Sequence, residues 1–583
     1  MKNRLIILLL LLGGVQSCSL DEKMVSSSRP EAYYQTEAQC IAALNGCYNP
    51  LRSIYCSVNY FQVCEVQTDL MYNGRRGQYN AILQVSPSQP QFGATMWQQG
   101  YLGVMRANAA YAGISRSPLT EKQKEPLLAE AVVLRALFYY ILTSNFGNVP
   151  YYTEEVTSEN NQQIARLPRM SAHDTRNALI EELREWVVEK KALDFAPTNS
   201  GTNKQQYRCG AAVGLYLAGK MCLWEERWTD AIEMFGYLED IYGNGAGLPD
   251  GALTGYPLSD IPFNKRHTPE VILEISNISV DYGLQLYGSV ATYTTPIRAD
   301  SVIEEDVNDA EDAETMADPD NDLYDGIGIP ELGKYARTHV PIRPTRKIFR
   351  KLMPYNSPDR RRSHYEITAT RAKTGPGEVV EMTDGGGYLA WGWAGYDPED
   401  DRSVAEPMFR LFNAVTTPGY RPYLGNKFWC FGMTGANDNN SYKAFRFAGA
   451  ILGLSEAWYR KGDYNKACAY LSAVKERAGL DLVQPTDFAT PLDLLEEIQN
   501  EYARELFGEF CRKHDLVRWG IWYDSVMEYN VRASYNGGLD GGENNTRLGA
   551  NIKPCHEYYP IPDAQITYSG GALDNDEYNK YGL

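Results

Sequence analysis

The sequence predicts a mainly α-helical protein, in which helical hairpins form a scaffold and a long, loop-rich insertion with short strands interrupts them. Residues 129–146 carry apolar side chains on nearly every helical face, which is typical of a buried core helix. Two later segments, 211–242 and 444–478, share the pattern of a helix pair. Between them, residues 243–440 are rich in Gly, Pro, Asp and aromatic residues, which favour turns and short strands.

The N-terminus has the layout of a secretory signal peptide. Two basic residues precede the apolar run Leu5–Leu12, and a stretch of small residues ends at Cys18. This context resembles a bacterial lipobox, which implies removal of residues 1–17, lipidation (palmitate) of Cys18 and a tether over residues 18–30. The acidic stretch Ser19–Glu22 resembles the surface-export signal of some lipoproteins. The alternative is a simple signal peptide in which the cysteine is incidental.

Composition excludes some functions and leaves others open. The formal net charge of −18 disfavours nucleic acid, because phosphates favour clusters of Lys and Arg. The 42 tyrosines outnumber the 17 phenylalanines, and phenol rings with a polar group suit a surface that binds polar ligands. Compositional drift would explain the same excess. An exported chain could form disulfides, but the spacing of its cysteines assigns no pair and matches no zinc site.

Residues 31–242 are predicted to form the N-terminal helical region. Helical periodicity predicts four further segments around the core helix, near residues 40–48, Met96–Ser115, Ala172–Lys191 and Ala211–Tyr242. The segment Met96–Ser115 and the core helix should form an antiparallel hairpin. The last segment should contain two helices with a tight join at Glu226 and Arg227.

The core helix carries two charges that need partners. Glu130 and Arg135 are five positions apart, so their side chains point about 140° away from each other and do not pair. Together with Asn145 they interrupt the apolar run, which argues against a membrane span. Each charge should therefore pair with another element, because unpaired buried charge is costly. Gly147 should end the helix and Pro150 should prevent its resumption.

Five pairs of residues recur at a constant offset of 236 positions. The pattern has a small residue, a larger residue three positions on, an aromatic residue, an alanine and a bulky apolar residue. The first copy is Gly219, Cys222, Trp228, Ala231 and Phe235, and the second is Ser455, Trp458, Tyr464, Ala467 and Leu471. This spacing resembles the tetratricopeptide helix pair, whose alanine allows the two helices to cross closely.

The insertion at residues 243–440 should contain short strands such as Glu270–Ile275. Its segment Asp300–Asp325 is strongly acidic, and the alternating carboxylates of Asp318–Asp322 are weakly suggestive of calcium. The turn glycine is missing and Ile329 takes position twelve, so a solvated acidic loop is the favoured interpretation. No other cofactor is indicated.

Two stretches combine aromatic side chains with hydrogen-bonding groups or flexible backbone. The first follows Thr68 and contains Asp69, Tyr72, Asn73, Arg75, Arg76 and Tyr79. The second, Gly385–Tyr396, contains Trp391, Trp393 and Tyr396. Aromatic rings stack on sugars while Arg and Asn bond hydroxyl groups. The alternatives are a solvated loop for the first stretch and a strand with core-facing tryptophans for the second.

The C-terminal region, residues 441–583, returns to helical periodicity. Helices are predicted over Ala444–Lys461, Tyr464–Ala478 and Asp493–Phe510. No nucleophile elbow, phosphate-binding loop, zinc-protease motif or dinucleotide fingerprint occurs anywhere in the chain. The six histidines are scattered, and nothing selects a pair of carboxylates for glycoside cleavage. The sequence therefore favours binding over catalysis.

Four separated stretches resemble the signatures of the SusD/RagB outer-membrane lipoproteins. They are AEAVVLRALFYYILTSNFGNVP, FRFAGAILGLSEAWYRKGDYNKACAYLSAVKERAGL, EEIQNEYARELFGEFCRKHDLVRWG and the closing YYPIPDAQI with Leu573, Asn575 and Tyr578. The chain departs from the usual residues at Gly449, Tyr502, Phe510, Asp574 and Glu577.

The resemblance implies a SusD-like α/α superhelix whose loops face a ligand. It implies a non-catalytic cell-surface lipoprotein, anchored in the outer membrane and facing the exterior, that caps a SusC-like TonB-dependent transporter. Such proteins deliver oligosaccharides, or peptides in the RagB branch. A surface glycan hydrolase is the less favoured alternative. The resemblance carries over no ligand-contacting residue, but it adds weight to the two aromatic stretches and makes Glu130 and Arg135 structural.

Overall fold

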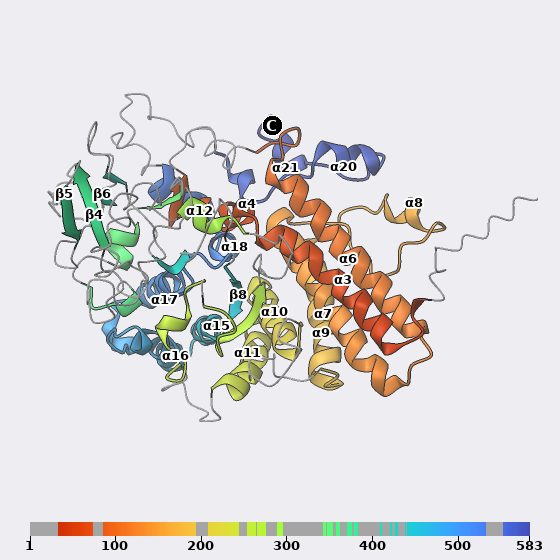
Figure 1. The fold of residues 1–583 in the computed structure, drawn as a ribbon, viewed down its shortest axis with the longest axis horizontal. Helices are drawn as coiled ribbons and strands as arrows, with labels where there is room; N and C mark the ends of the chain where they lie inside the picture. The colour runs from red at the N-terminus through yellow and green to blue at the C-terminus, as the bar shows by residue number, and fades with distance from the viewer. Residues whose placement is uncertain are drawn as a thin grey trace, which may run out of the picture.

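A computed structural model describes the fold (Figure 1). It describes residues 33–73, 85–193, 208–243, 253–263, 265–275, 288–294, 342–345, 347–353, 357–361, 370–375, 378–382, 409–410, 420–421, 426–428, 438, 440–531 and 552–583.

A continuous row of helices forms the scaffold, and each member packs against the next along the row. In order, the helices are α3 (Glu37–Tyr55), α6 (Phe92–Arg116), α7 (Glu121–Phe146), α9 (Ala172–Leu183), α10 (Ala211–Trp224), α11 (Trp228–Tyr242), α15 (Phe447–Arg460), α16 (Tyr464–Arg477) and α17 (Pro491–Glu505). The row places the insertion between α11 and α15, which themselves pack together. The prediction of a mainly helical scaffold interrupted by a loop-rich insertion is therefore confirmed.

Helix α7 is the core helix that the sequence predicts, and every residue from Leu127 to Phe146 is buried. It begins eight residues before the predicted start, because Thr120 and Gln123 form a capping box there. Gly147 ends it at a positive φ of 68°. The helix is long and apolar enough to cross a membrane, but its most apolar window lies wholly inside the protein.

Both charges of α7 pair with other elements, as predicted. The Glu130 carboxylate accepts hydrogen bonds from the Tyr48 hydroxyl at 2.6 Å and from Arg208 Nε at 3.0 Å. The Arg135 guanidinium donates to Asn108 Oδ1 at 2.9 Å and forms an ion pair with Glu182.

The antiparallel hairpin of α6 and α7 depends on small residues. A side chain at Gly100 would meet Leu142 at 2.8 Å, and one at Gly103 would collide with the ring of Phe138. Glycines at these positions let the two helix backbones approach closely, which the apolar pattern alone does not specify.

The two repeat copies are helical hairpins, α10–α11 and α15–α16. In the first, Gly219 leaves room for the ring of Phe235, so the helices cross where the repeat pattern predicts. In the second, Ser455 Oγ donates to Ala467 O at 2.8 Å across the same crossing. The same Phe235 ring fills the space left by Gly453 on α15, which joins the two hairpins.

In the described part of the chain, four two-stranded antiparallel sheets lie in or beside the insertion. They pair β1 (Met71–Asn73) with β3 (Ile342–Pro344), β2 (Val271–Ile275) with β8 (Tyr442–Arg446), β4 (Thr370–Gly375) with β5 (Glu378–Met382), and β6 (Phe409–Arg410) with β7 (Tyr420–Arg421). Strand β2 confirms the strand predicted near Glu270–Ile275.

Two predicted helix bounds are wrong at one end. Residues 444–446 belong to β8, because they pair with Val271 and Leu273 of β2 before α15 begins at Phe447. Helix α17 stops at Glu505, five residues early, because Gly508 and Phe510 adopt positive φ angles of 74° and 60°.

Shorter segments complete the described chain. They are Val58–Phe61 (α4), Asn161–Ile164 (α8), Val290–Thr294 (α12), Arg512–Arg518 (α18), Trp522–Ser525 (α19), Asp563–Tyr568 (α20) and Asp576–Asn579 (α21), with single turns at Gln62–Val66, Arg184–Glu189, Leu258–Asp260, Ile348–Leu352, Asn426–Phe428, Pro485–Asp487, Val526–Val531 and Pro554–Glu557. The nine cysteines of the described residues are free thiols.

Candidate functional site: the anchored base of a loop face

The first aromatic stretch leaves the scaffold from a paired strand. Strand β1 places Tyr72 opposite Arg343 of β3, and Asn73 opposite Ile342. Next to this pair, Thr345 N donates to Leu70 O at 2.8 Å, and the Thr345 hydroxyl donates to Asp69 O. The chain that leads into the candidate loop is therefore fixed to the insertion before the loop begins.

We call the anchored segment before the candidate loop, residues 66–73, the base of the loop. Asp69 is the charged residue at its centre. Its side chain is fully buried, and Arg512 binds it with two hydrogen bonds, Nε to Oδ1 at 2.9 Å and Nη2 to Oδ2 at 2.7 Å. Lys347 Nζ donates to Oδ2 at 2.7 Å. Burial alone would raise the pKa of Asp69, but the charges of Arg512 and Lys347 outweigh it and hold that pKa below its ordinary value. Both carboxylate oxygens thus face protein cations.

The C-terminal region encloses the same base from the other side. Asn530 Nδ2 lies 2.8 Å from Val66 O, 2.6 Å from Thr68 O and 2.7 Å from Met71 O. Trp522 Nε1 donates to Gln67 O at 2.6 Å. These contacts satisfy the carbonyl groups of a buried, irregular segment, which would otherwise be costly.

A buried ion network supports the base. Arg446, at the end of β8, donates to Glu270 Oε1 at 2.7 Å, to Glu505 Oε1 at 2.9 Å and to Glu509 Oε2 at 2.8 Å. Lys427 Nζ lies 2.7 Å from Glu509 Oε1. Because α17 ends at Glu505, the turn that follows it can bring Glu509 back to Arg446.

Arg361 extends the network into the insertion. It is fully buried, and it contacts Asp359 at 2.8 Å, Glu501 at 2.5 Å and Glu505 at 3.1 Å. Burial would raise the pKa of Glu501, but Arg361 and Arg504 lower it to about 2. Each of these three carboxylates has a cationic partner. The network therefore holds the insertion against α17 and has a structural role.

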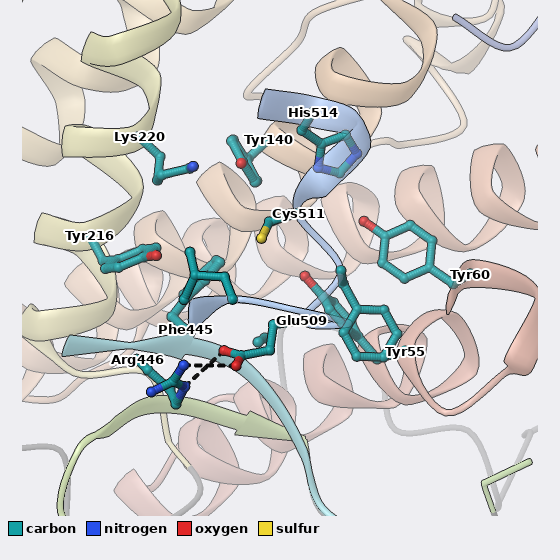
Figure 2. Close-up of a pocket in the computed structure, with 13 residues that line it drawn as sticks. Tyr55, Tyr60, Tyr140, Tyr216, Lys220, Phe445, Arg446, Glu509, Cys511 and His514 are labelled. Carbon is teal, nitrogen blue, oxygen red and sulfur yellow. Dashed lines mark hydrogen bonds and ion pairs between the residues drawn. The ribbon is translucent and has the colours of Figure 1, made fainter. Parts of the chain in front are cut away.

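A small pocket lies among buried side chains, and Figure 2 shows Tyr55, Tyr60, Tyr140, Tyr216, Lys220, Cys511 and His514 around it. Its interior has room for about one water molecule. Burial lowers the pKa of His514 to about 3 and raises the pKa of the Cys511 thiol. A neutral imidazole of such low basicity beside a protonated thiol is not an activated nucleophile pair.

Most of the residues predicted to bind ligand lie outside the described residues. These are Arg75, Arg76, Tyr79, Trp391, Trp393 and Tyr396, together with the lipidation residue Cys18 and the acidic stretch Asp318–Asp322. Tyr72 and Asn73 are described through their backbone in β1. Within the described ranges, no three His, Cys, Asp or Glu side chains form a group that could hold a metal ion.

The sequence did not reveal the residues that anchor the loop. Arg512 lies in the stretch CRKHDLVRWG, so its place in a signature was visible, but its partner Asp69 is 443 positions away. Lys347 and Asn530 carry no sequence signal, because a lysine or asparagine in a loop is ordinarily solvated.

The fold and this base define the chain as a helical-repeat scaffold that carries anchored loops. The SusD family model matches residues 419–578, and a second model, described as starch-binding associating with outer membrane, matches residues 19–193. SusD-like protein P25 of Formosa agariphila is 22% identical over 606 residues, covering 99% of each chain.

Solved structures agree in fold. A SusD-like protein from Bacteroides fragilis superimposes with a TM-score of 0.61 at 18% identity, covering 93% of this chain and 97% of that one. A laminarin binding SusD-like protein gives the same TM-score and identity, covering 93% and 99%. Surface glycan-binding protein A from Bacteroides uniformis gives 0.60 at 17% identity, covering 93% and 100%. These structures show the fold, and the two family models together with the full-length relative support a SusD-like family protein.

Proposed function

We propose that this protein captures oligosaccharides at the cell surface and passes them, without cleaving them, to a SusC-like TonB-dependent transporter. The observation that carries the proposal is family membership along the whole chain, with relatives of the same architecture that are named for binding laminarin or surface glycans. The anchored base at Asp69 supports it, because a fixed base lowers the entropy cost of ordering a binding loop.

In this proposal the ligand contacts come from the two aromatic stretches. Tyr72 and Tyr79 stack on sugar rings, and Arg75 and Arg76 bond hydroxyl groups. Trp391, Trp393 and Tyr396 supply a second aromatic surface. Asn73 donates to the ligand, whereas Asp69 acts as a positioning residue through Arg512 and Lys347.

The test is a calorimetric binding screen with soluble laminarin, starch, xylan and host glycans, and with peptide mixtures. Tyr72→Ala and Trp391→Ala should each weaken binding of the best glycan at least tenfold, about 1.4 kcal/mol, at an unchanged thermal midpoint. Tyr568→Ala is the matched control, because this tyrosine is exposed on α20 and belongs to neither stretch.

Three results would contradict the proposal or favour one of its alternatives. Full affinity in both variants would refute the assigned contacts. Binding of peptides but no glycan would favour the RagB-like alternative. Release of reducing ends from a bound glycan at catalytic rates would favour the hydrolase alternative.

We further propose that Cys18 carries the lipid that holds the protein at the outer membrane, facing the exterior. Cells expressing Cys18→Ala should lose palmitate labelling, and the protein should move from the membrane to the soluble fraction. Protease accessibility on intact cells tests the orientation. An unlabelled wild-type protein would contradict the anchor.

A further inference from the structure

A second pocket lies where the insertion meets helix α16, and no residue of the proposed ligand stretches lines it. Its volume is about 370 Å³, at the small end of the range for small-molecule sites. Its lining combines residues 253, 254, 256–259 and Arg360 of the insertion with residues of α16.

One wall of this pocket is held rigidly. Arg477 has only 5% of its side chain exposed, and its guanidinium lies 2.9 Å from Glu270 and 3.3 Å from Tyr256 O, with a further ion pair to Glu505. Arg360 N donates to Ala478 O at 2.7 Å. The buried ion network therefore supports the pocket wall, as a preorganised site requires.

The side chains that face the pocket suit a neutral, hydroxyl-rich ligand. Thr254, Ser259 and Glu476 are exposed, and within the described part of the chain their side chains make no hydrogen bond or ion pair. The lining carries one exposed negative charge, on Glu476, and one exposed positive charge, on Arg360, so these two cancel in sum. The positive charge of Arg477 is already met by Glu270 and Glu505. Pro257 is exposed and adds apolar surface for the C–H faces of a ring.

We propose that this pocket is a second carbohydrate subsite, on the helical scaffold, that takes one neutral pyranose unit of a glycan. The proposal rests on the proposed function for its class of ligand. The subsite lies in a different place from the proposed ligand stretches, because α16 and the start of the insertion form the pocket, and the loop that follows β1 does not. A glycan bound at both sites would gain affinity through the higher effective concentration at the second.

The test is saturation-transfer NMR on the mature chain with D-glucose, D-galactose and D-mannose as neutral probes, and D-glucuronate and D-glucosamine as charged ones. At least one neutral hexose should receive saturation from the wild type. Glu476→Ala and Arg360→Ala should each reduce that signal at least fivefold at an unchanged thermal midpoint. Glu125→Ala is the matched control, an exposed helical glutamate on α7.

Several results would decide against the subsite. No transfer to any neutral hexose, equal signals in wild type and both variants, or transfer only to charged sugars would overturn it. Tyr72→Ala and Trp391→Ala separate the two proposals. A hexose signal lost only in those two variants overturns the subsite and leaves the proposed function standing. A signal that depends on Glu476, in a protein that binds no glycan in the calorimetric screen, supports the subsite and contradicts the proposed function.

Discussion

Most buried charged residues in this protein stabilise the fold. Arg135 illustrates the rule: its guanidinium lies inside the helix row, against Asn108, Glu182 and the ring of Tyr111 at 5.5 Å. The same holds for Asp69, which the sequence placed among the ligand contacts and which pairs with two cations beneath the surface.

Arg135→Ala should lower the free energy of unfolding by about 3 kcal/mol, because it leaves the Glu182 carboxylate without its cation in a largely buried site. Urea denaturation measures the change. An unfolding curve that superimposes on that of the wild type would show that Glu182 is satisfied by solvent.

His514 should make the stability depend on pH. Burial lowers its pKa in the folded protein to about 3, whereas the unfolded chain titrates near 6.5. Between these values the unfolded chain binds a proton that the folded chain does not. Stability is therefore unaffected above about pH 6.5 and falls as the pH decreases, by roughly 2 kcal/mol at pH 5.

Urea denaturation at pH 7 and pH 5 checks this contribution, with His514→Gln as the comparison. The variant should lose less stability between the two pH values than the wild type does. Below about pH 5, protonation of the buried carboxylates Glu501 and Asp515, whose pKa values lie at about 2, should destabilise both proteins. Identical losses between pH 7 and pH 5 would exclude His514 as the source.

At the scale of elements, close helix crossings depend on single small residues. In the α6–α7 hairpin, the ring of Phe138 occupies the space above Gly103. In the repeat hairpins, Phe235 does the same above Gly219 and Gly453. Gly449, where the family usually has glutamate, leaves room for the hydroxyl of Tyr216, so this departure from the signature has a packing explanation.

Gly103→Ala should cost about 1–3 kcal/mol, because the added methyl group forces the Phe138 ring or the helix to move. Gly46→Ala on α3 is the matched control, since nothing lies within 4 Å of the added carbon. It should stabilise the protein by about 0.5–1 kcal/mol through helix propensity. Thermal midpoints of the two variants should therefore move in opposite directions, and a common direction would contradict the crossing geometry.

At the scale of the whole molecule, the ion network joins the insertion to the scaffold, so we expect the two to unfold together. Asp359 and Arg361 belong to the insertion, whereas Glu501 and Glu505 lie on α17. Strand β2 pairs with β8 across the same junction. The insertion is thus joined to the helical scaffold at two places, through the buried ion pairs of Arg361 and through the β2–β8 pair.

Arg361→Ala should lower the free energy of unfolding by about 3–5 kcal/mol, since it leaves three buried carboxylates short of a cation. The control is Arg116→Ala, which removes a half-exposed pair with Glu155 and should cost less than about 1 kcal/mol. Urea denaturation followed by two probes should give one coincident transition. Two separate transitions in the wild type would show that the insertion folds independently.

The sequence by itself determined the helical hairpins, the termination of α7 at Gly147, the repeat crossing and the family. These features are local, because helical periodicity, a glycine after an apolar run and a small residue at a crossing act over a few positions. The signature stretches likewise predicted where α16 begins, at Tyr464.

Only the tertiary structure decided the end of α17, the start of α15 and the role of Asp69. Each depends on charged partners or strands that are far apart in the chain, such as Glu270 with Arg446, which are 176 positions apart. Such pairs leave no periodic trace, since a single buried carboxylate looks like a solvated one until the fold brings its cation to it.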